Sequence, residues 1–459
     1  MLARFRHWLG LSPTEKARPE TADPIAHGVD DARGSSSKQQ GRVSELQSKS
    51  EDAGGAQQRA THGSTRRGKP TSIEFVIGLD FGTSSTKVVV RTPYRPGQPA
   101  NALPVPKSAR AEGCSHLWQS AVWYDSTRRT FSAVPVKGSA KLGGLKAAFI
   151  DNPGAMLHND VSVQEACAAY LALVLRETVS WTAKQRAFRG HSLQWSVNLG
   201  LPAATYDTPM LAPYLNLLHA AWNLANSGAE VALKDVRRAL DEEPTDDGVA
   251  LQVVPEVAAA VAGFARSQNR RNGLYVLADV GASTLDACCF RLSEPVEGID
   301  HYTMLVADVQ PLGVAATAAM LKRGRSEAEI ETAVERVMRA VIWQTKRSRD
   351  PRAPEWRTTL PLFLCGGGAA NNLHRHAMEA LTPWLKQHTE AEGVPINALE
   401  EPDSLSSNKD TEPGRLVVAW GLSHPEIDIG DLVRPSEIED IPKASYRDIS
   451  DQFVGAEQV

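Results

Sequence analysis

Apolar residues follow two patterns along the chain: short continuous runs that are typical of buried strands, and longer stretches with helical spacing. The apolar runs 73–77 and 87–91 flank a turn of Gly, Thr and Ser, which predicts a β-hairpin. The same layout returns at 275–279 and 285–292. Further strands are predicted at 120–124, 130–134, 193–199, 250–254 and 360–364. The repeated hairpin suggests that the chain contains two related halves.

Helical patterns separate these strands. Ser162, with Glu165 three residues later, forms a capping box that predicts the start of a long helix over 163–184. The polar segment 228–249 is predicted to be a surface insertion around one helix. Other helices are predicted at 209–225, 257–265, 314–322, 327–346 and 371–387. Because strands and helices alternate, the pattern favours an α/β fold.

Composition narrows the class of protein. The chain has 459 residues, 42% of them hydrophobic, which is enough for two or three domains. Its net charge of −4 favours no nucleic-acid partner, and none is predicted. The five cysteines are scattered without metal-ligand spacing, so a reducing compartment and a cytoplasmic location are expected. No apolar run approaches the ~18 residues that would predict a membrane span.

Charge is uneven at the two ends of the chain. Residues 1–72 carry 12 Lys and Arg against 8 Asp and Glu, whereas residues 425–459 carry 3 against 9. Residues 12–72 have almost no large apolar side chains and are predicted to be a disordered linker. Met1 to Leu11 reads as a basic amphipathic peptide. An anionic membrane surface, a protein partner and the chain's own domain are all candidate binding sites for it.

The first hairpin turn carries candidate chemistry. Its apolar strand ends at Asp80 and turns through Gly82, Thr83 and Ser84 before Lys87. Backbone amides and hydroxyls of such a turn can bind phosphate oxygens, and a carboxylate can bind Mg²⁺ through water. Lys87 would add a positive charge near the β- and γ-phosphates.

The second hairpin turn offers the same groups. Its strand ends at Asp279, and Asp286 follows seven residues later. The turn residues are Gly281, Ala282, Ser283 and Thr284. Either turn by itself is equally explained as a tight hairpin in which Gly supplies a positive φ. Two copies about 200 residues apart favour a phosphate chain held between them.

These motifs resemble those of the superfamily of actin, sugar kinases and the 70-kDa heat-shock protein ATPases. Residues 80–87 resemble its first phosphate motif and 279–286 its second. Residues 364–369, with Gly366, Gly367 and Gly368, resemble its adenosine motif. Segments 255–260 and 412–422 resemble its two connecting helices. The resemblance implies a two-lobed actin-like ATPase fold, each lobe built on a ribonuclease-H-like mixed sheet with flanking helices.

The resemblance also assigns roles. Asp80 and Asp279 would hold Mg²⁺ through water, and Gly366 to Gly368 would flank the ribose and adenine of ATP or ADP. Residues that would contact phosphates are Gly82, Thr83, Gly281, Ala282 and Thr284.

Hydrolysis would need a water molecule aligned by a carboxylate near the γ-phosphate. Asp279 and Glu256 are the candidates, and Glu256 is equally suited to the N-terminus of its own helix. Lys146 lies where the heat-shock branch has a phosphate-contacting lysine, although an ordinary exposed lysine also fits. Lys346 and Arg347 are candidates for stacking on adenine, or for complementing a helix C-terminus.

The resulting layout is a basic peptide (1–11), a linker (12–72), lobe I (73–265), lobe II with a reduced outer subdomain (266–411), a closing helix returning to lobe I (412–424) and an acidic tail (425–459). The tail is too short for the peptide-binding domain of the heat-shock chaperones. The expected function is therefore a Mg²⁺- and ATP-dependent switch or chaperone-like regulator that hydrolyses ATP weakly. The first alternative is a membrane-associated actin-like filament or segregation protein, and the second is a nucleotide-binding pseudoenzyme. A small-molecule kinase is the third alternative.

Overall fold

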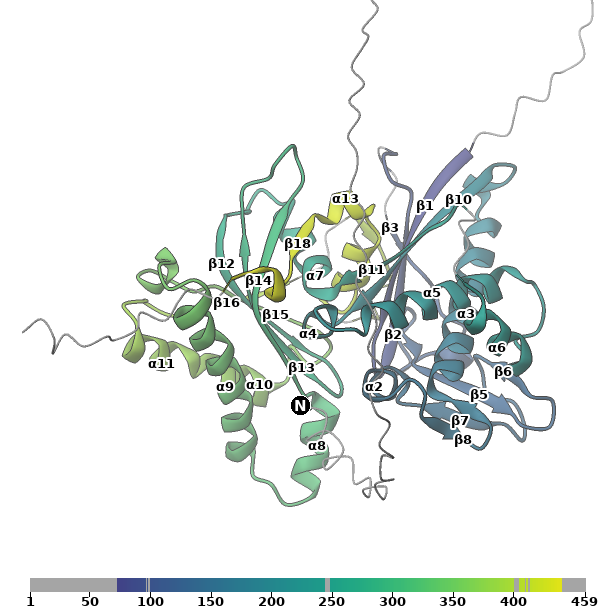
Figure 1. Cartoon of the computed structure of the whole chain (residues 1–459), viewed down its shortest axis with the longest axis horizontal. Coiled ribbons are helices and arrows are strands. Elements are labelled where there is room, and N and C mark those ends of the chain that lie inside the picture. Colours follow the sequence, from purple (N-terminus) through teal and green to yellow (C-terminus); the bar gives the residue numbers. More distant parts are fainter. Residues whose placement is uncertain are drawn as a thin grey trace, which may run out of the picture. The chain divides into compact units, whose positions relative to one another are not determined.

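The computed structural model describes residues 72–439, apart from 96, 98–99, 244–247, 400–403, 409 and 412. The predicted basic peptide, almost all of the linker and residues 440–459 of the predicted tail lie outside this range. The described residues belong to one compact unit. The structure is of the mixed α/β class, as the alternation of strands and helices predicted (Figure 1).

The first sheet is built around the first predicted hairpin. Strand β1 pairs antiparallel with β2 on one side and parallel with β10 on the other, and β11 and β3 extend the sheet in the order β11-β10-β1-β2-β3. The short strands β17 and β4 pair with β3 and β2. The bounds are β1 Ser72–Phe81, β2 Ser85–Arg91, β3 Ala100–Ala102, β4 Trp118–Gln119, β10 Ser192–Leu201, β11 Ala250–Pro255 and β17 Leu405–Ser406.

The second sheet repeats this arrangement around the second hairpin. Strand β12 pairs antiparallel with β13 and parallel with β15, in the order β16-β15-β12-β13-β14-β18. The bounds are β12 Gly273–Val280, β13 Leu285–Leu292, β14 His301–Gln310, β15 Leu362–Cys365, β16 Ile396–Ala398 and β18 Asp431–Val433. Six strands of each sheet therefore share one order and one set of orientations, so the two halves are related in topology.

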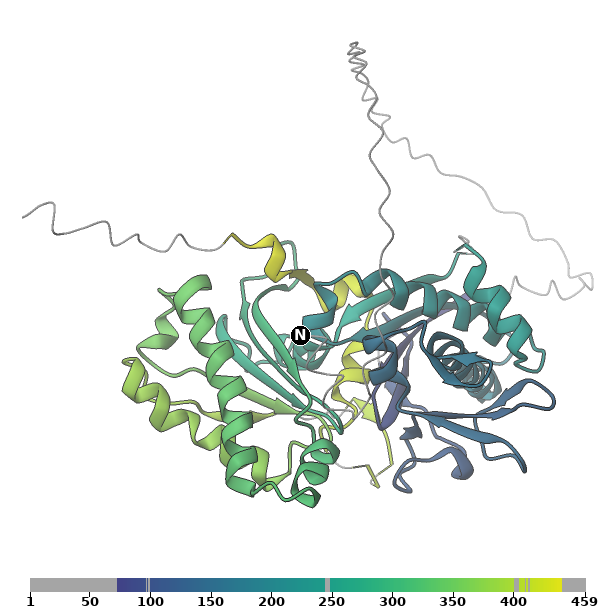
Figure 2. The same cartoon turned by 60° about the horizontal axis from the view of Figure 1, so that its bottom comes forward.

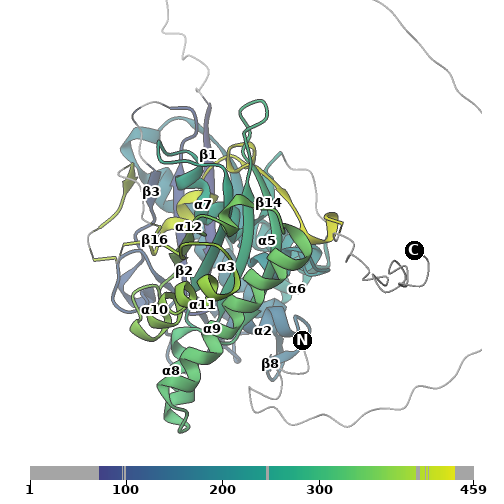
Figure 3. The same cartoon turned by 90° about the vertical axis from the view of Figure 1, so that its left-hand side faces the viewer.

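Helices pack against both sheets. Helix α3 (Val163–Lys184) begins with the predicted capping box of Ser162 and Glu165 and packs with α5 (Leu211–Asn226) and α6 (Leu233–Asp241). Beside the second sheet lie α9 (Glu327–Gln344), α10 (Asn372–Glu379) and α11 (Leu381–His388) (Figure 3). Helix α8 (Val314–Lys322) precedes α9. None of the described helices is both long and apolar enough to cross a membrane.

Smaller elements complete the first half of the chain. They are the three-stranded sheet β6-β5-β7 (Thr130–Ser132, Ala121–Asp125, Ala140–Gly143), the pair β8 (Met156–His158) and β9 (Val161–Ser162), and helices α2 (Leu145–Asp151) and α4 (Ala203–Tyr206).

Helices α7 (Glu256–Ala265) and α12 (Val417–Leu422) cross between the two sheets (Figure 2). Their contact needs a glycine, because a Cβ on Gly421 would lie 1.9 Å from the carbonyl oxygen of Ala259. Helix α12 also packs directly on β1, where a Cβ on Gly78 would lie 2.2 Å from the oxygen of Ala419. The predicted closing helix therefore does return to the first sheet.

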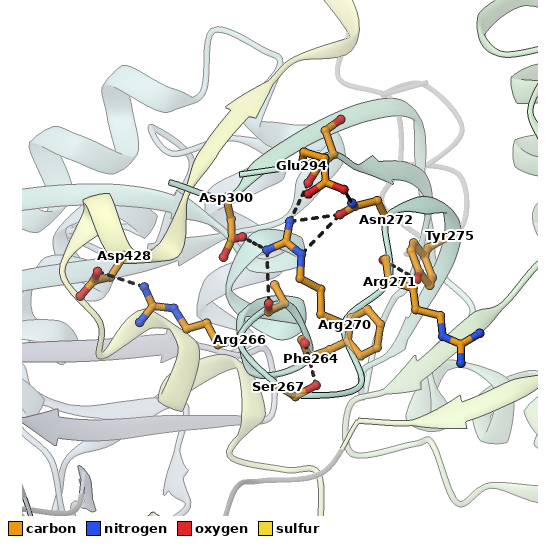
Figure 4. Close-up of polar contacts among 12 residues, drawn as sticks. Phe264, Arg266, Ser267, Arg270, Arg271, Asn272, Tyr275, Glu294, Asp300 and Asp428 are labelled. Carbon is orange, nitrogen blue, oxygen red and sulfur yellow. Dashed lines mark hydrogen bonds and ion pairs between the residues drawn. The ribbon is translucent and has the colours of Figure 1, made fainter. Parts of the chain in front are cut away.

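A network around Arg270 holds the end of the second sheet where β12 begins (Figure 4). The Arg270 guanidinium pairs with Asp300 and donates hydrogen bonds to the carbonyl oxygens of Ser293 and Ala265, the latter at the end of α7. Arg266 pairs with Asp428 of α13 (Glu426–Ile429) at 3.0 Å. The network ties α7 to three strands and to the C-terminal segment.

Three sequence expectations need correction. The helix expected over 371–387 is two helices, because Pro383 in the first turn of α11 has no N–H to bond to Glu379. Strand β14 was not anticipated, since its polar and apolar residues do not alternate regularly. Part of the expected tail belongs to the fold, because β18 pairs parallel with β14 and the Ser436 amide donates to Asp207 at 3.0 Å.

Candidate functional site

The turn of the first hairpin places a carboxylate, a lysine and small residues together. Gly82 must be a glycine, since a Cβ there would lie 2.3 Å from the carbonyl oxygen of Ser85. Lys87 Nζ donates to Asp80 Oδ2 at 3.0 Å across the hairpin. Thr83 is partly exposed and Ser84 is exposed, so their polar groups are accessible. Asp80 itself is buried at 6% exposure.

The turn of the second hairpin is supported by helix α8. Amides at the start of α8 donate to turn carbonyls, from Val314 to Gly281 at 3.0 Å and from Ala315 to Ala282 at 2.7 Å. The Gly313 amide donates to the carbonyl of Ser283 at 3.2 Å. These bonds occupy acceptor groups of the turn. The partly exposed side of the turn is therefore suited to binding an anion, because an anion needs hydrogen-bond donors and cannot use acceptors.

The glycine turn after β15 lies directly against the second hairpin. Gly366 has φ +85°, and a Cβ on it would lie 2.1 Å from Asp279 Oδ1. The Gly368 amide donates to the carbonyl of Val280 at 2.8 Å. Strands β12 and β15 are parallel neighbours with Asp279 opposite Cys365. The predicted second phosphate motif and adenosine motif are thus brought together by the sheet.

Lys146 and Glu256 form a buried ion pair. The Nζ of Lys146 donates to Glu256 Oε1 at 2.7 Å, and each residue is 7% exposed. The alternative that Lys146 is an ordinary exposed lysine is therefore wrong. Glu256 is also the first residue of α7, where a carboxylate is favourable, so the two explanations offered for it are compatible.

The acidic side chains around this pair influence one another strongly. Burial raises the pKa of Asp279, and the nearby carboxylate of Asp80 raises it further. Burial also raises the pKa of Asp286 well above its ordinary value, with added repulsion from Asp279 and Glu256. Asp286 Oδ1 is buried and has no hydrogen-bond partner. The structure thus gathers carboxylates from both hairpins and from α7 into one acidic centre.

The carboxylates of this centre also affect the pKa values of the buried pair, Lys146 and Glu256. Burial raises the pKa of Glu256 to about 7, an effect that Lys146 opposes and that Asp80 and Asp279 reinforce. Burial lowers the pKa of Lys146, but the attraction of Glu256 more than offsets this, and the pKa is raised overall. The pair therefore favours the charged form of Lys146, whereas burial makes Glu256 a weaker acid than an ordinary glutamate.

The acidic centre fits a hydrated cation better than a directly bound one. Within the described residues, no three His, Cys, Asp or Glu side chains are arranged to ligate a metal. Nevertheless, the mutual repulsion of Asp80, Asp279 and Asp286, together with the unpartnered oxygen of Asp286, would be relieved by a nearby positive charge. Asp80 and Asp279 are the residues suited to hold Mg²⁺ through water.

The Lys346 side chain packs near the start of β12. Lys346 Nζ lies over the ring of Trp356, 5.4 Å from its centroid. The neighbouring Glu355 accepts a bond from the Leu274 amide at the start of β12. Asp279 lies five residues further along β12, about 17 Å away at the rise of an extended strand. Stacking of either residue on adenine stays a prediction, because these contacts place only the Lys346 side chain, on Trp356.

Sequence reasoning missed two residues beside the turns. Ser120 Oγ donates to the carbonyl of Gly82 at 2.6 Å and lies 2.9 Å from Thr86 Oγ1, so it braces the first turn. Arg415 lies against Gly367 in the glycine turn. No periodicity or spacing indicates either contact, because the partners are far apart in the chain.

Fold and site together define a mixed α/β protein with two topologically related sheets and an acidic centre where their hairpin turns meet a glycine turn. Comparison with models of known protein families gave no match, and no curated protein proved significantly similar in sequence.

Proposed function

We propose that this chain binds Mg²⁺ and ATP, hydrolyses ATP weakly and works as a nucleotide-dependent switch of the actin and heat-shock protein type. The observation that carries the proposal is the acidic centre, to which both copies of the hairpin and the glycine turn contribute. A single anion-binding turn is common, whereas two turns of matching topology facing shared carboxylates favour a metal-bound polyphosphate.

The fold supports the proposal. A hairpin with a third antiparallel strand on one side and two parallel strands on the other is the arrangement expected for a ribonuclease-H-like sheet, and the chain has it twice. Helices α7 and α12 cross between the sheets, as the connecting helices of a two-lobed ATPase would. Small rotations about this crossing would open and close the space between the hairpin turns.

The residues suit the chemistry of phosphate hydrolysis. Donors of the two turns, with Lys87 and Lys146, would bind and neutralise the phosphates. Bound Mg²⁺ would neutralise charge on the phosphate oxygens. Glu256, with a pKa of about 7, would accept a proton from water or orient it. Because Glu256 is held by Lys146, its basicity is limited, which is consistent with slow turnover.

The structure gives less support to a filament. Between Asp286 and Gly366, besides the sheet strands β13, β14 and β15, the described chain has α8, α9 and short helical turns, so the outer part of the second half is small. Longitudinal contacts of actin-like filaments involve that region. A switch acting on a protein partner is therefore preferred over a cytoskeletal role, and the location expected for it remains the cytoplasm.

The proposal predicts that the full-length protein binds Mg·ATP in isothermal titration calorimetry and that Asp279→Ala abolishes binding or weakens it at least tenfold. Asp279 is the carboxylate that contacts the glycine turn and the second hairpin. Asp431→Ala is the matched control, because Asp431 lies in the same sheet with a side chain 68% exposed. A phosphate-release assay on the same proteins measures hydrolysis.

Each outcome decides between functions. Equal ATP binding by Asp279→Ala and the parent protein would show that the site is wrongly assigned. Binding without phosphate release by the parent protein would identify a pseudoenzyme. Absence of ATP binding by the parent protein would reject the proposed function altogether.

A further inference from the structure

Arg415 occupies an unexpected position beside the glycine turn. Atoms of its guanidinium lie 3.2–3.3 Å from the place that a Cβ on Gly367 would take. Any larger residue at 367 would displace this group. Gly367 has no unusual backbone angle, unlike Gly366 at φ +85°. A Cβ at 367 would thus require the Arg415 guanidinium to shift by a few tenths of an ångström, whereas Gly366 is required by its own backbone and by Asp279.

The arginine is held in place from the other half of the molecule. Arg415 Nη1 donates to Glu112 Oε2 at 2.7 Å. Glu112 precedes β4 of the first sheet, whereas Gly367 follows β15 of the second. The Arg415 side chain is only 10% exposed, while that of Glu112 is 55% exposed. The guanidinium therefore bridges the two halves at the glycine turn.

Backbone geometry fixes both ends of this bridge. Glu112 has φ +54° and Gly113 has φ +76°, two consecutive left-handed residues that define a tight turn. The Cys114 amide closes this turn by donating to the carbonyl of Ala111 at 3.0 Å. Before Arg415, Gly414 has φ +82°. A non-glycine residue adopts a left-handed backbone only when the surroundings require it, so the position of Glu112 is strongly determined.

Arg415 and the acidic centre flank the same turn. Gly366 contacts Asp279, and the adjacent Gly367 contacts Arg415. A ligand with phosphates at the acidic centre and a planar ring further along the turn would reach both. A guanidinium is flat and weakly hydrated, so it stacks well on aromatic rings.

We propose that Arg415, positioned by Glu112, packs against the base of the bound nucleotide. This inference rests on the proposed function, because it concerns the nucleoside end of the same ligand. It assigns recognition of the base to one bridging side chain from the segment before α12.

The test compares two ligands that share phosphates but differ in the base. Calorimetry with Mg·ATP and with Mg·tripolyphosphate is performed on the full-length parent protein and on Arg415→Met. We expect Arg415→Met to weaken ATP binding about tenfold, in the range of a desolvated cation–π contact, and to leave tripolyphosphate binding unchanged. Arg415→Lys should give an intermediate loss, because it keeps the charge without the planar group.

Two further variants serve as a probe and a control. Glu112→Gln should accelerate release of a fluorescent ATP analogue several-fold, since Arg415 loses its anchor. Arg128→Met is the matched control, because Arg128 forms an ion pair with Glu230 at 2.9 Å on the small sheet, away from the glycine turn. Thermal unfolding of every variant shows whether it is folded, and Glu112→Gln tests the proposal even where Arg415→Met does not fold.

The outcomes separate this inference from the proposed function. Unchanged ATP affinity in folded Arg415→Met, or unchanged release from Glu112→Gln, would overturn the role of Arg415 alone. An equal loss for ATP and tripolyphosphate would make Arg415 a phosphate contact and would also overturn it. A parent protein that binds neither ligand would contradict the proposed function itself.

Discussion

Single side chains at the acidic centre are under electrostatic strain, and Asp286 is the clearest case. Its carboxylate is buried near Asp279 and Glu256, and one of its oxygens has no hydrogen-bond partner. Burial of an uncompensated charge costs stability, unless the group is protonated or a cation lies close by. Such a residue is retained more readily for binding than for folding. We therefore expect the site to trade stability of the free protein for affinity toward a cation, such as the Mg²⁺ that accompanies a bound polyphosphate.

The cost of burying the Asp286 carboxylate predicts how Asp286→Asn changes the melting temperature of the protein. Because the native pKa of Asp286 is raised, the folded chain keeps a proton that the unfolded chain loses, and the free energy of unfolding falls as pH rises above the ordinary value of 3.8. The neutral amide removes this penalty. We expect Asp286→Asn to have a higher melting temperature than the parent protein at pH 8, with a smaller difference at pH 5.

The same variant should bind Mg·ATP more weakly, which calorimetry at pH 8 measures. Asp431→Asn serves as the control, since its exposed side chain should alter neither the melting temperature nor ATP affinity. A melting temperature at pH 8 below that of the parent protein would show that Asp286 is compensated within the fold.

At the scale of elements, the crossing of α7 and α12 links the two sheets. The helices touch backbone to backbone at Gly421 and Ala259, and α7 begins with Glu256 of the acidic centre. Its other end is tied by Arg266 and Arg270 to α13 and to the second sheet. Any change in the ion pair of Lys146 and Glu256 therefore reaches the contact between the halves through a single rigid helix.

Gly421→Ala tests how tightly these helices are packed. A Cβ at 421 would lie 1.9 Å from the Ala259 oxygen, so the helices must separate. We expect a loss of about 2–3 kcal/mol in the free energy of unfolding, measured by urea denaturation. Gly143→Ala in β7 is the control, because the nearest atom to its added Cβ is 4.0 Å away. A change there within about 0.5 kcal/mol is expected. A loss at Gly421 no larger than that of the control would mean that the crossing is loose.

For the whole molecule, every residue assigned to the site lies between Asp80 and Arg415. Residues 1–71 lie outside the described part of the chain, and their basic charge suits a partner. The acidic C-terminal segment is divided, since residues up to Glu439 pack on the second sheet and on α4. Partner choice is therefore expected to depend mainly on the first 71 residues.

A chain starting at Ser72 tests this separation of roles. We expect it to bind Mg·ATP within about twofold of the full-length protein in calorimetry, and to lose the partners or anionic vesicles that the full-length protein retains in affinity capture and sedimentation. Both proteins should remain monomeric with and without ATP in analytical ultracentrifugation. ATP-dependent pelleting, with filaments in negative-stain images, would instead support the cytoskeletal alternative.

Local patterns were sufficient for most elements and for part of the site. The capping box of Ser162 and Glu165, the two hairpins and the glycine turn depend on neighbouring residues, so they were predicted with nearly correct bounds. Strand β14 was missed because its pairing with β13 and β18 decided it, and the break at Pro383 was missed because one absent amide decided it.

By itself, the sequence determined the α/β class, the repeat of two hairpins and the residue types able to bind phosphate, because these follow from periodicity and from short-range turn chemistry. The tertiary structure decided which of those residues meet. It paired Lys146 with Glu256 across 110 positions, pressed Gly366 onto Asp279 and laid Arg415 on Gly367. Burial and mutual repulsion, which set the pKa of Glu256 near 7, exist only once distant segments share a low-dielectric interior.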